Sequence, residues 1–205
     1  MSVVHLIDTL TEWARQNVCQ QIRLKVAPEN TAANDEGYKY ELVNPAAFPM
    51  YVPTPEKLPP NIHTSFPSLC VGFAKGTDLP AAGSGSVKIQ LSFSAWDTGL
   101  HGKDIFHPVG NNAFRRWSGE EADAYFKRSG DGWRDAWNFV DIALRAVESV
   151  THIGEYAIDR SAPIEFGPLA EQEAIPDLYP FWFAWVTFTV TYPLRRNIQN
   201  LENFL

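Results

Sequence analysis

The alternation of side chains along this sequence is clearest over residues 181–192, which lie between two prolines. Aromatic and β-branched residues dominate the stretch, and they favour a pleated strand. The opposite face begins with Phe181, Phe183 and Trp185 and continues with threonines, so its aromatic half needs a cover of its own. We therefore expect a long central strand. Its first face is almost wholly apolar and consists of Trp182, Ala184, Val186, Phe188, Val190 and Tyr192.

Residues 3–22 repeat their apolar side chains at the spacing of an amphipathic helix. Ser2 stands directly before this pattern, where a hydroxyl can accept a hydrogen bond from the first helical turn. Cys19 falls on the polar side of the predicted helix. The pattern predicts a first helix that covers the sheet.

Residues 133–150 carry a second helical stripe. Ile142 lies almost opposite the stripe, so we expect it to be exposed or to make a contact. The predicted apolar positions are Trp133, Ala136, Trp137, Val140, Ala143, Leu144, Val147 and Val150.

Three shorter segments also read as strands, at 68–75, 86–97 and 153–160. The first two are separated by a loop rich in Gly, Ala and Ser, which predicts an antiparallel hairpin. Two helices on one face of such a sheet give an economical packing. The sequence thus predicts one α+β domain over residues 1–205, with a single antiparallel or mixed sheet of about four or five strands.

Residues 28–67 contain eight prolines, which excludes long helices and central strands. The segment is nevertheless too apolar for a disordered linker. We expect a short strand at Tyr38–Val43 and an extended proline-rich arm laid on the surface. Phe48, Met50 and Tyr51 are the apolar side chains that this arm would offer to a partner.

Residues 98–131 form a second excursion, which we expect to be an inserted loop with a short helix. The helix would begin at the capping box Ser118–Glu121. Residues 164–177 are acidic and contain three prolines with Pro163 included, so we expect a connector there.

The net charge of −7 disfavours non-specific binding of nucleic acid, which requires Lys and Arg patches. It suits a surface past which DNA slides without sticking. The chain begins without the pattern of a secretory signal and has no apolar stretch of membrane-spanning length, so no membrane partner is expected. Two cysteines give neither a disulfide framework nor zinc spacing, and we expect reduced thiols.

His101 and His107, with Asp97 and Asp104, are the side chains that most resemble a metal site. Their spacing matches no strong zinc signature, so polar loop residues are the simpler interpretation. The sequence offers no nucleophile with an activating base and no phosphate-binding glycine loop. We expect no catalytic residues, no cofactor, no metal, and a protein that is not an enzyme.

Apolar side chains on the arm, on the second helix and on the central strand are the candidate functional residues. Aromatic residues are enriched at protein interfaces, so these side chains predict a subunit or partner interface. The alternative is that the arm simply packs on the aromatic half of the strand. The candidate interface residues are Phe48, Met50, Tyr51, Ile142, Phe181, Phe183 and Trp185.

Four segments together resemble the tail terminator, or tail completion, proteins of tailed bacteriophages. They are Gly132-Trp-Arg-Asp-Ala-Trp-Asn-Phe-Val-Asp141, the closing segment 176–193 with Tyr-Pro-Phe-Trp-Phe, the hairpin end Phe93-Ser-Ala-Trp-Asp97, and Asn44-Pro-Ala-Ala-Phe-Pro-Met-Tyr51 followed by 67–71. The resemblance covers most of residues 40–195 apart from the excursion at 98–131.

The resemblance implies an α+β fold and a hexameric ring that caps the tail tube and meets the neck. The implied partners are other copies of the chain, the tail tube protein, the neck or head–tail connector protein, and a sheath protein where the tail is contractile. DNA would pass through the lumen without specific binding. Such a protein is assembled in the host bacterial cytoplasm and resides in the virion, and the family has no catalytic residues to transfer.

Two alternatives stay open at this point. The chain could be another neck protein, such as a head–tail joining or stopper protein, because these also form rings of small subunits. It could also be a metal-dependent enzyme built around His101 and His107.

Overall fold

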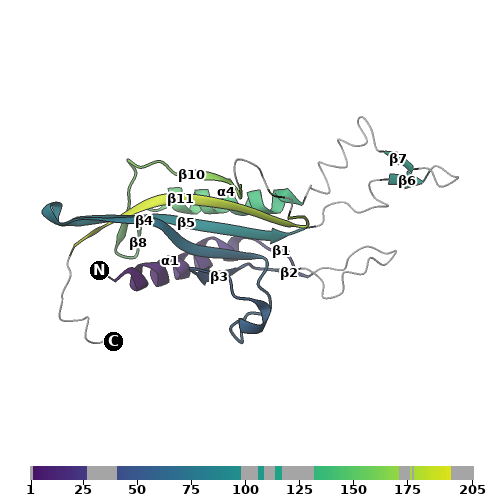
Figure 1. Cartoon of the computed structure of the whole chain (residues 1–205), viewed down its shortest axis with the longest axis horizontal. Coiled ribbons are helices and arrows are strands. Elements are labelled where there is room, and N and C mark those ends of the chain that lie inside the picture. Colours follow the sequence, from purple (N-terminus) through teal and green to yellow (C-terminus); the bar gives the residue numbers. More distant parts are fainter. Residues whose placement is uncertain are drawn as a thin grey trace.

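The computed structural model describes residues 2–26, 41–97, 106–108, 114–116, 132–170, 176 and 178–194. At its centre is a seven-stranded mixed sheet in which three long strands lie side by side (Figure 1). The strand order is β3-β4-β5-β11-β9-β8, and β10 also pairs with β11. The three long strands are β4 (Ser68–Leu79), β5 (Ser84–Trp96) and β11 (Phe181–Pro193).

β11 is the long central strand that the sequence predicts. It runs antiparallel to β5 over its whole length, from Phe181 opposite Trp96 to Pro193 opposite Ser84. Its other side is shared by β9 and β10, so strands flank β11 on both sides.

The prediction of a loop over residues 76–85 is wrong, because both strands of the hairpin continue almost to the turn. The turn is a short 3₁₀ helix, η3 (Pro80–Ala82), followed by Gly83 at φ 60°. Gly85 lies against the ring of Tyr192, where a Cβ would come within 2.5 Å of ring carbons. This glycine is needed for close approach inside the sheet, whereas the sequence pattern suggested a loop.

The first helix, α1 (Val3–Asn17), ends earlier than predicted and continues as the 3₁₀ turn η1 (Cys19–Gln21). The Ser2 hydroxyl accepts from the backbone N–H of His5 at 3.5 Å, as the sequence pattern predicts. The placement of Cys19 on the polar side is wrong, because its thiol is 1% exposed in the tighter turn. Burial raises the pKa of this thiol to about 12.

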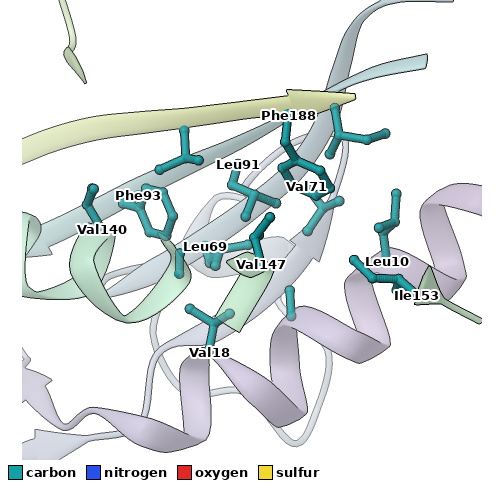
Figure 2. Packing of buried hydrophobic residues seen from close by; sticks show 14 of the residues in the cluster. Leu10, Val18, Leu69, Val71, Leu91, Phe93, Val140, Val147, Ile153 and Phe188 are labelled. Carbon is teal, nitrogen blue, oxygen red and sulfur yellow. The ribbon is translucent and has the colours of Figure 1, made fainter. Parts of the chain in front are cut away.

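Both helices pack on the same face of the sheet, because their buried side chains join one cluster with alternate residues of β4, β5 and β11. The second helix is α4 (Trp133–Ser149), with bounds close to those predicted. Figure 2 shows this packing, in which Leu10 of α1, Val18 directly after α1, and Val140 and Val147 of α4 lie beneath the sheet. The sheet contributes Leu69, Val71, Leu91, Phe93 and Phe188 to the same cluster.

The buried face of α4 is turned slightly from the predicted stripe. Phe139, which the stripe leaves out, is completely buried and meets Phe93 edge-on with 4.9 Å between ring centroids. Trp133 is 39% exposed, and Trp137 contacts Phe166 of a neighbouring strand. Trp137 thus has its aromatic partner on that strand, at the edge of the sheet, instead of in the centre of the core.

The strand that contacts Trp137 is β10 (Glu165–Pro168), in the segment predicted to be a connector. It pairs antiparallel with β11, with Phe166 opposite Val186. The strand predicted at 153–160 is a small hairpin of β8 (His152–Ile153) and β9 (Tyr156–Ile158). The sheet is therefore larger than the four or five strands predicted, while the α+β class is confirmed.

The proline-rich segment contributes to the sheet, which the prediction of a surface arm did not foresee. Its strand β3 (Ala46–Pro49) pairs in parallel with β4 and forms one edge of the sheet. Its strand β2 (Leu42–Val43) pairs with β1 (Leu24–Lys25), and a 3₁₀ turn, η2 (Pro55–Lys57), follows. Of the strand predicted at Tyr38–Val43, the first three residues lie outside the described part of the chain.

In the excursion at 98–131, the structure describes β6 (Phe106–Pro108) and β7 (Phe114–Arg116), which pair antiparallel. The short helix predicted from Ser118 and the residues His101 and Asp104 lie outside the described residues.

Candidate subunit interfaces

Three segments that are distant in sequence meet at the end of β5. The backbone N–H of Asp97 donates to the oxygen of Pro180 at 3.1 Å, and the indole of Trp182 donates to the oxygen of Asp97 at 2.7 Å. Gly132 lies so close to these groups that a Cβ at this position would be only 2.2 Å from the Asp97 oxygen, so the site requires glycine. Three of the segments that carry the phage resemblance thus form one junction.

The junction also holds a half-buried group of charges. The Asp97 carboxylate is 3% exposed and pairs with the Lys25 ammonium from β1. Burial, together with the neighbouring Asp97 carboxylate, raises the pKa of Asp135 to about 6, while Lys25 acts in the opposite direction. A side-chain hydrogen bond joins the two carboxyl groups and also favours protonated Asp135.

A carboxyl pair with a raised pKa is a pattern found at catalytic sites, so its surroundings decide its role. Neither carboxyl group is among the side chains that line the neighbouring hollow, which is bounded by apolar residues. Over the described ranges, no group of three or more His, Cys, Asp or Glu side chains is placed to hold a metal ion. The arrangement fits a structural junction that fixes the end of the sheet to α4.

The aromatic residues at the start of β11, Phe181, Phe183 and Trp185, pack against other segments of the same chain. Phe66 lies on Phe181 and Phe183, with 5.2 Å and 6.2 Å between ring centroids. Trp185 donates its indole N–H to the Pro168 oxygen at 2.9 Å. All three strand residues are half-buried, so packing within the chain already accounts for much of their surface.

A first exposed apolar surface lies where β3 ends. It surrounds a groove of about 280 Å³ that Pro49, Met50 and Phe73 line together with the first turns of α1, including Asp8. We call it the β3-edge surface; it comprises Val3, Val4, Met50, Tyr51 and Phe73, which are 48%, 67%, 53%, 67% and 39% exposed.

The backbone at Met50 is strained. Its φ is 63°, and the N–H of Tyr51 donates to the oxygen of Pro49 at 2.7 Å, closing a three-residue γ-turn. A γ-turn with a positive central φ is the rarer and more strained of the two forms. Apart from glycine residues, Met50 alone has a positive φ among the described residues. The two large apolar side chains at this turn, Met50 and Tyr51, are both more than half exposed.

A second exposed apolar surface lies near β10 and the start of α4. We call it the β10-edge surface; it comprises Trp133, Phe166, Leu169, Leu178 and Tyr179, which are 39%, 53%, 39%, 42% and 56% exposed. It borders a hollow of about 330 Å³ whose described lining side chains carry no charge. The Arg134 guanidinium lies over the Trp133 ring at 4.9 Å from its centroid.

The other four predicted interface residues differ in their exposure. Met50 and Tyr51 are exposed, as an interface requires, whereas Phe48 is 3% exposed and belongs to the interior. Phe48 points inward because β3 joins the sheet, so its assignment to an interface is corrected. Ile142 is half-buried and packs against the core, which leaves only part of its surface for a partner.

The sequence pattern does not predict the β10-edge surface. It places Trp133 on the buried stripe of the helix and indicates no role for Tyr179, the aromatic residue beside Pro180. One feature of the sequence does point to this surface. Large apolar side chains are concentrated on both sides of the segment 169–178, and that segment is too polar to bury them.

A scan against models of known protein families gives no match for this chain, and a search of curated proteins gives none either. In the part of the chain that the structure describes, no helix is both long enough and apolar enough to cross a membrane.

Proposed function

We propose that this chain is a tail terminator subunit of a tailed bacteriophage, which forms a ring, with six copies as the expected number, at the end of the tail tube. The observation that carries the proposal is the pair of exposed apolar surfaces on one small chain. Contiguous apolar patches on soluble proteins commonly mark interaction sites. Two different patches on one subunit would let it contact one neighbouring copy on each side, as ring formation requires.

The resemblance of four segments to tail terminators supports the choice of this family among ring-forming proteins. Three of those segments supply Asp97, Gly132 and Trp182, which meet at one junction. A resemblance at residues that meet in one junction is more specific than a resemblance at scattered positions. The α+β class of the chain agrees with the fold that the resemblance implies.

The charge of the chain fits the same role. The net charge is −7 per subunit, and a ring whose lumen shares this acidic balance would repel the phosphate backbone of DNA. DNA could then pass without being held. The proposed neighbours are the tail tube protein below, the neck or connector protein above, and a sheath protein in a contractile tail.

The direct test is to locate the chain in a virion. A reconstruction of the tail–neck region should place six copies between tail tube and connector, and concentrated purified protein should give six-fold rings by native mass spectrometry and electron microscopy. Density for this chain at another position, or in another symmetry, would reject the tail terminator role.

Two other functions give different outcomes in the same experiments. A head–tail joining or stopper protein would be found on the connector side of the neck. An enzyme that uses His101 and His107 would carry stoichiometric zinc or iron, which would disappear in the His101→Ala, His107→Ala double variant.

A further inference from the structure

The two apolar surfaces lie at opposite edges of the sheet. β3 forms one edge, and β10 lies beyond β11 on the other side (Figure 1). Two copies related by a two-fold axis would have to pair each surface with itself. A head-to-tail contact instead pairs one edge of a copy with the opposite edge of the next. Repetition of this contact gives a ring when the rotation between neighbouring copies closes, and an open filament when it does not.

Both surfaces are hollowed. The β3-edge surface also carries the strained turn of Met50 and Tyr51, which are 53% and 67% exposed, beside its groove of about 280 Å³. The β10-edge surface is hollowed to about 330 Å³. That volume is at the lower end of the roughly 300–1,000 Å³ of small-molecule pockets. It suits one or two apolar side chains better than a helix.

The lining of the hollow argues for a protein occupant. Small-molecule pockets place a few polar groups that orient the ligand. Here the described lining consists of aromatic side chains, leucines, prolines and alanine, and none of them carries a charge. Its polar groups are the Tyr179 hydroxyl and three indole N–H groups, of which that of Trp182 is already donated to Asp97. Buried apolar and aromatic anchors in such pockets dominate the energetics of protein interfaces.

The charges beside the two surfaces are opposite in sign. Asp8 lines the groove next to Met50, and Arg134 lies over Trp133 at the β10-edge surface. Opposite charges at the rim of an interface select the orientation of two partners more than they add affinity.

We propose that the Met50–Tyr51 turn of one copy inserts into the β10-edge hollow of the next copy, with Asp8 facing Arg134 across the contact. The inference deepens the proposed function, because it names the surfaces that close the ring, and it rests on ring formation alone. The strain at Met50 then has a role, since it holds the inserting side chains in place before the partner arrives.

Disulfide trapping tests the contact in the full-length chain. In a Cys70→Ser background, a Tyr51→Cys, Leu169→Cys double variant should form a ladder of covalent oligomers under mild oxidation. Cys19 is 1% exposed and its raised pKa disfavours the thiolate, so it stays out of the reaction. Each single variant should stay monomeric on a denaturing gel, and a mixture of the two should give a dimer and nothing larger.

Two results would overturn the inference. Self-cross-linking of Tyr51→Cys alone would indicate a two-fold contact, and failure of the double variant to cross-link in a sample that forms rings would place the contact elsewhere. Rings that form the ladder but are absent from the tail of the virion would reject the tail terminator role and leave this contact standing.

Charge exchange gives an independent test. Asp8→Arg alone and Arg134→Asp alone should each weaken association by about five- to tenfold, and the double exchange should restore it. Asp141→Arg, on the exposed face of α4, is the matched control and should leave association unchanged. Equal losses in the single and double variants would show that the two side chains do not face each other.

Discussion

Trp182 donates its indole N–H to the main-chain oxygen of Asp97 over 2.7 Å, which ties the start of β11 to the residue that follows β5. Gly132, at the start of α4, lies against both of these groups. The sheet and the second helix are thus joined at one point by three backbone segments.

Gly132→Ala should destabilise the fold by about 1–3 kcal/mol, because a methyl group would collide with the Asp97 backbone. The φ of Gly132 is −51°, which any residue adopts, so the effect is purely steric. Urea unfolding would measure it. Gly72→Ala is the control: a Cβ there meets nothing within 4 Å, so the free energy of unfolding should not fall and should rise by about 0.4–1 kcal/mol, because the unfolded chain loses freedom. Equal stability of the two variants would contradict the close contact.

Asp135 should make the protein less stable as the pH rises. Its pKa is raised from 3.8 to about 6 in the folded state, so the native protein binds more protons than the unfolded chain between these values. Its contribution is therefore fully present below pH 4 and is lost as the pH rises through 6. Asp135→Asn should remove this dependence and gain stability over the wild type at pH 8.

Thermal unfolding between pH 4 and pH 8 would measure the effect of Asp135. Asp141→Asn, on the exposed face of the same helix, should keep the wild-type slope. An unchanged slope in the Asp135 variant would mean that this carboxyl group titrates normally.

Phe139→Ala should cost about 3–5 kcal/mol, because the ring is completely buried against Phe93. Leu144→Ala should cost less, since Leu144 is only partly buried. Chemical denaturation of both variants beside Asn138→Ala, an exposed neighbour, gives the comparison. A larger loss at Leu144 than at Phe139 would mean that the helix is rotated toward the stripe predicted from the sequence.

Met50→Gly should separate folding from assembly. Glycine relieves a conformation that costs other residues about 1–2 kcal/mol, while it raises the entropy of the unfolded chain by about 0.5–1 kcal/mol. The monomer should therefore stay within about 1 kcal/mol of wild-type stability while association weakens. Analytical ultracentrifugation of Met50→Gly and Met50→Leu, which keeps a large apolar side chain, tests this. Wild-type association of the glycine variant would argue against the turn as an anchor.

Periodicity predicted the elements whose pattern is set by a large buried face. β11 and α4 are such elements, because each turns a continuous row of apolar side chains toward the core. β10 could not be predicted in this way, since Glu165–Pro168 contains a glycine and a proline and becomes a strand only because β11 offers an open edge. β3 entered the sheet for the same reason beside β4.

The candidate interface was half predictable. Met50 and Tyr51 stood out because large apolar residues in a proline-rich segment lack obvious partners within it. Trp133 did not stand out, because a tryptophan on a helical stripe normally reads as core. Its 39% exposure results from tertiary packing, which the periodicity of the helix does not contain.

The backbone contact between Asp97 and Gly132 has a consequence for how this chain can diverge. Asp97 and Gly132 are held together at one point, so a change in the number of residues between them leaves these two ends where they are. Loop-closure entropy changes by only about 0.6 kcal/mol for each doubling of length. Evolution can therefore lengthen, shorten or exchange this stretch to suit a different neighbour while the sheet and both helices stay as they are.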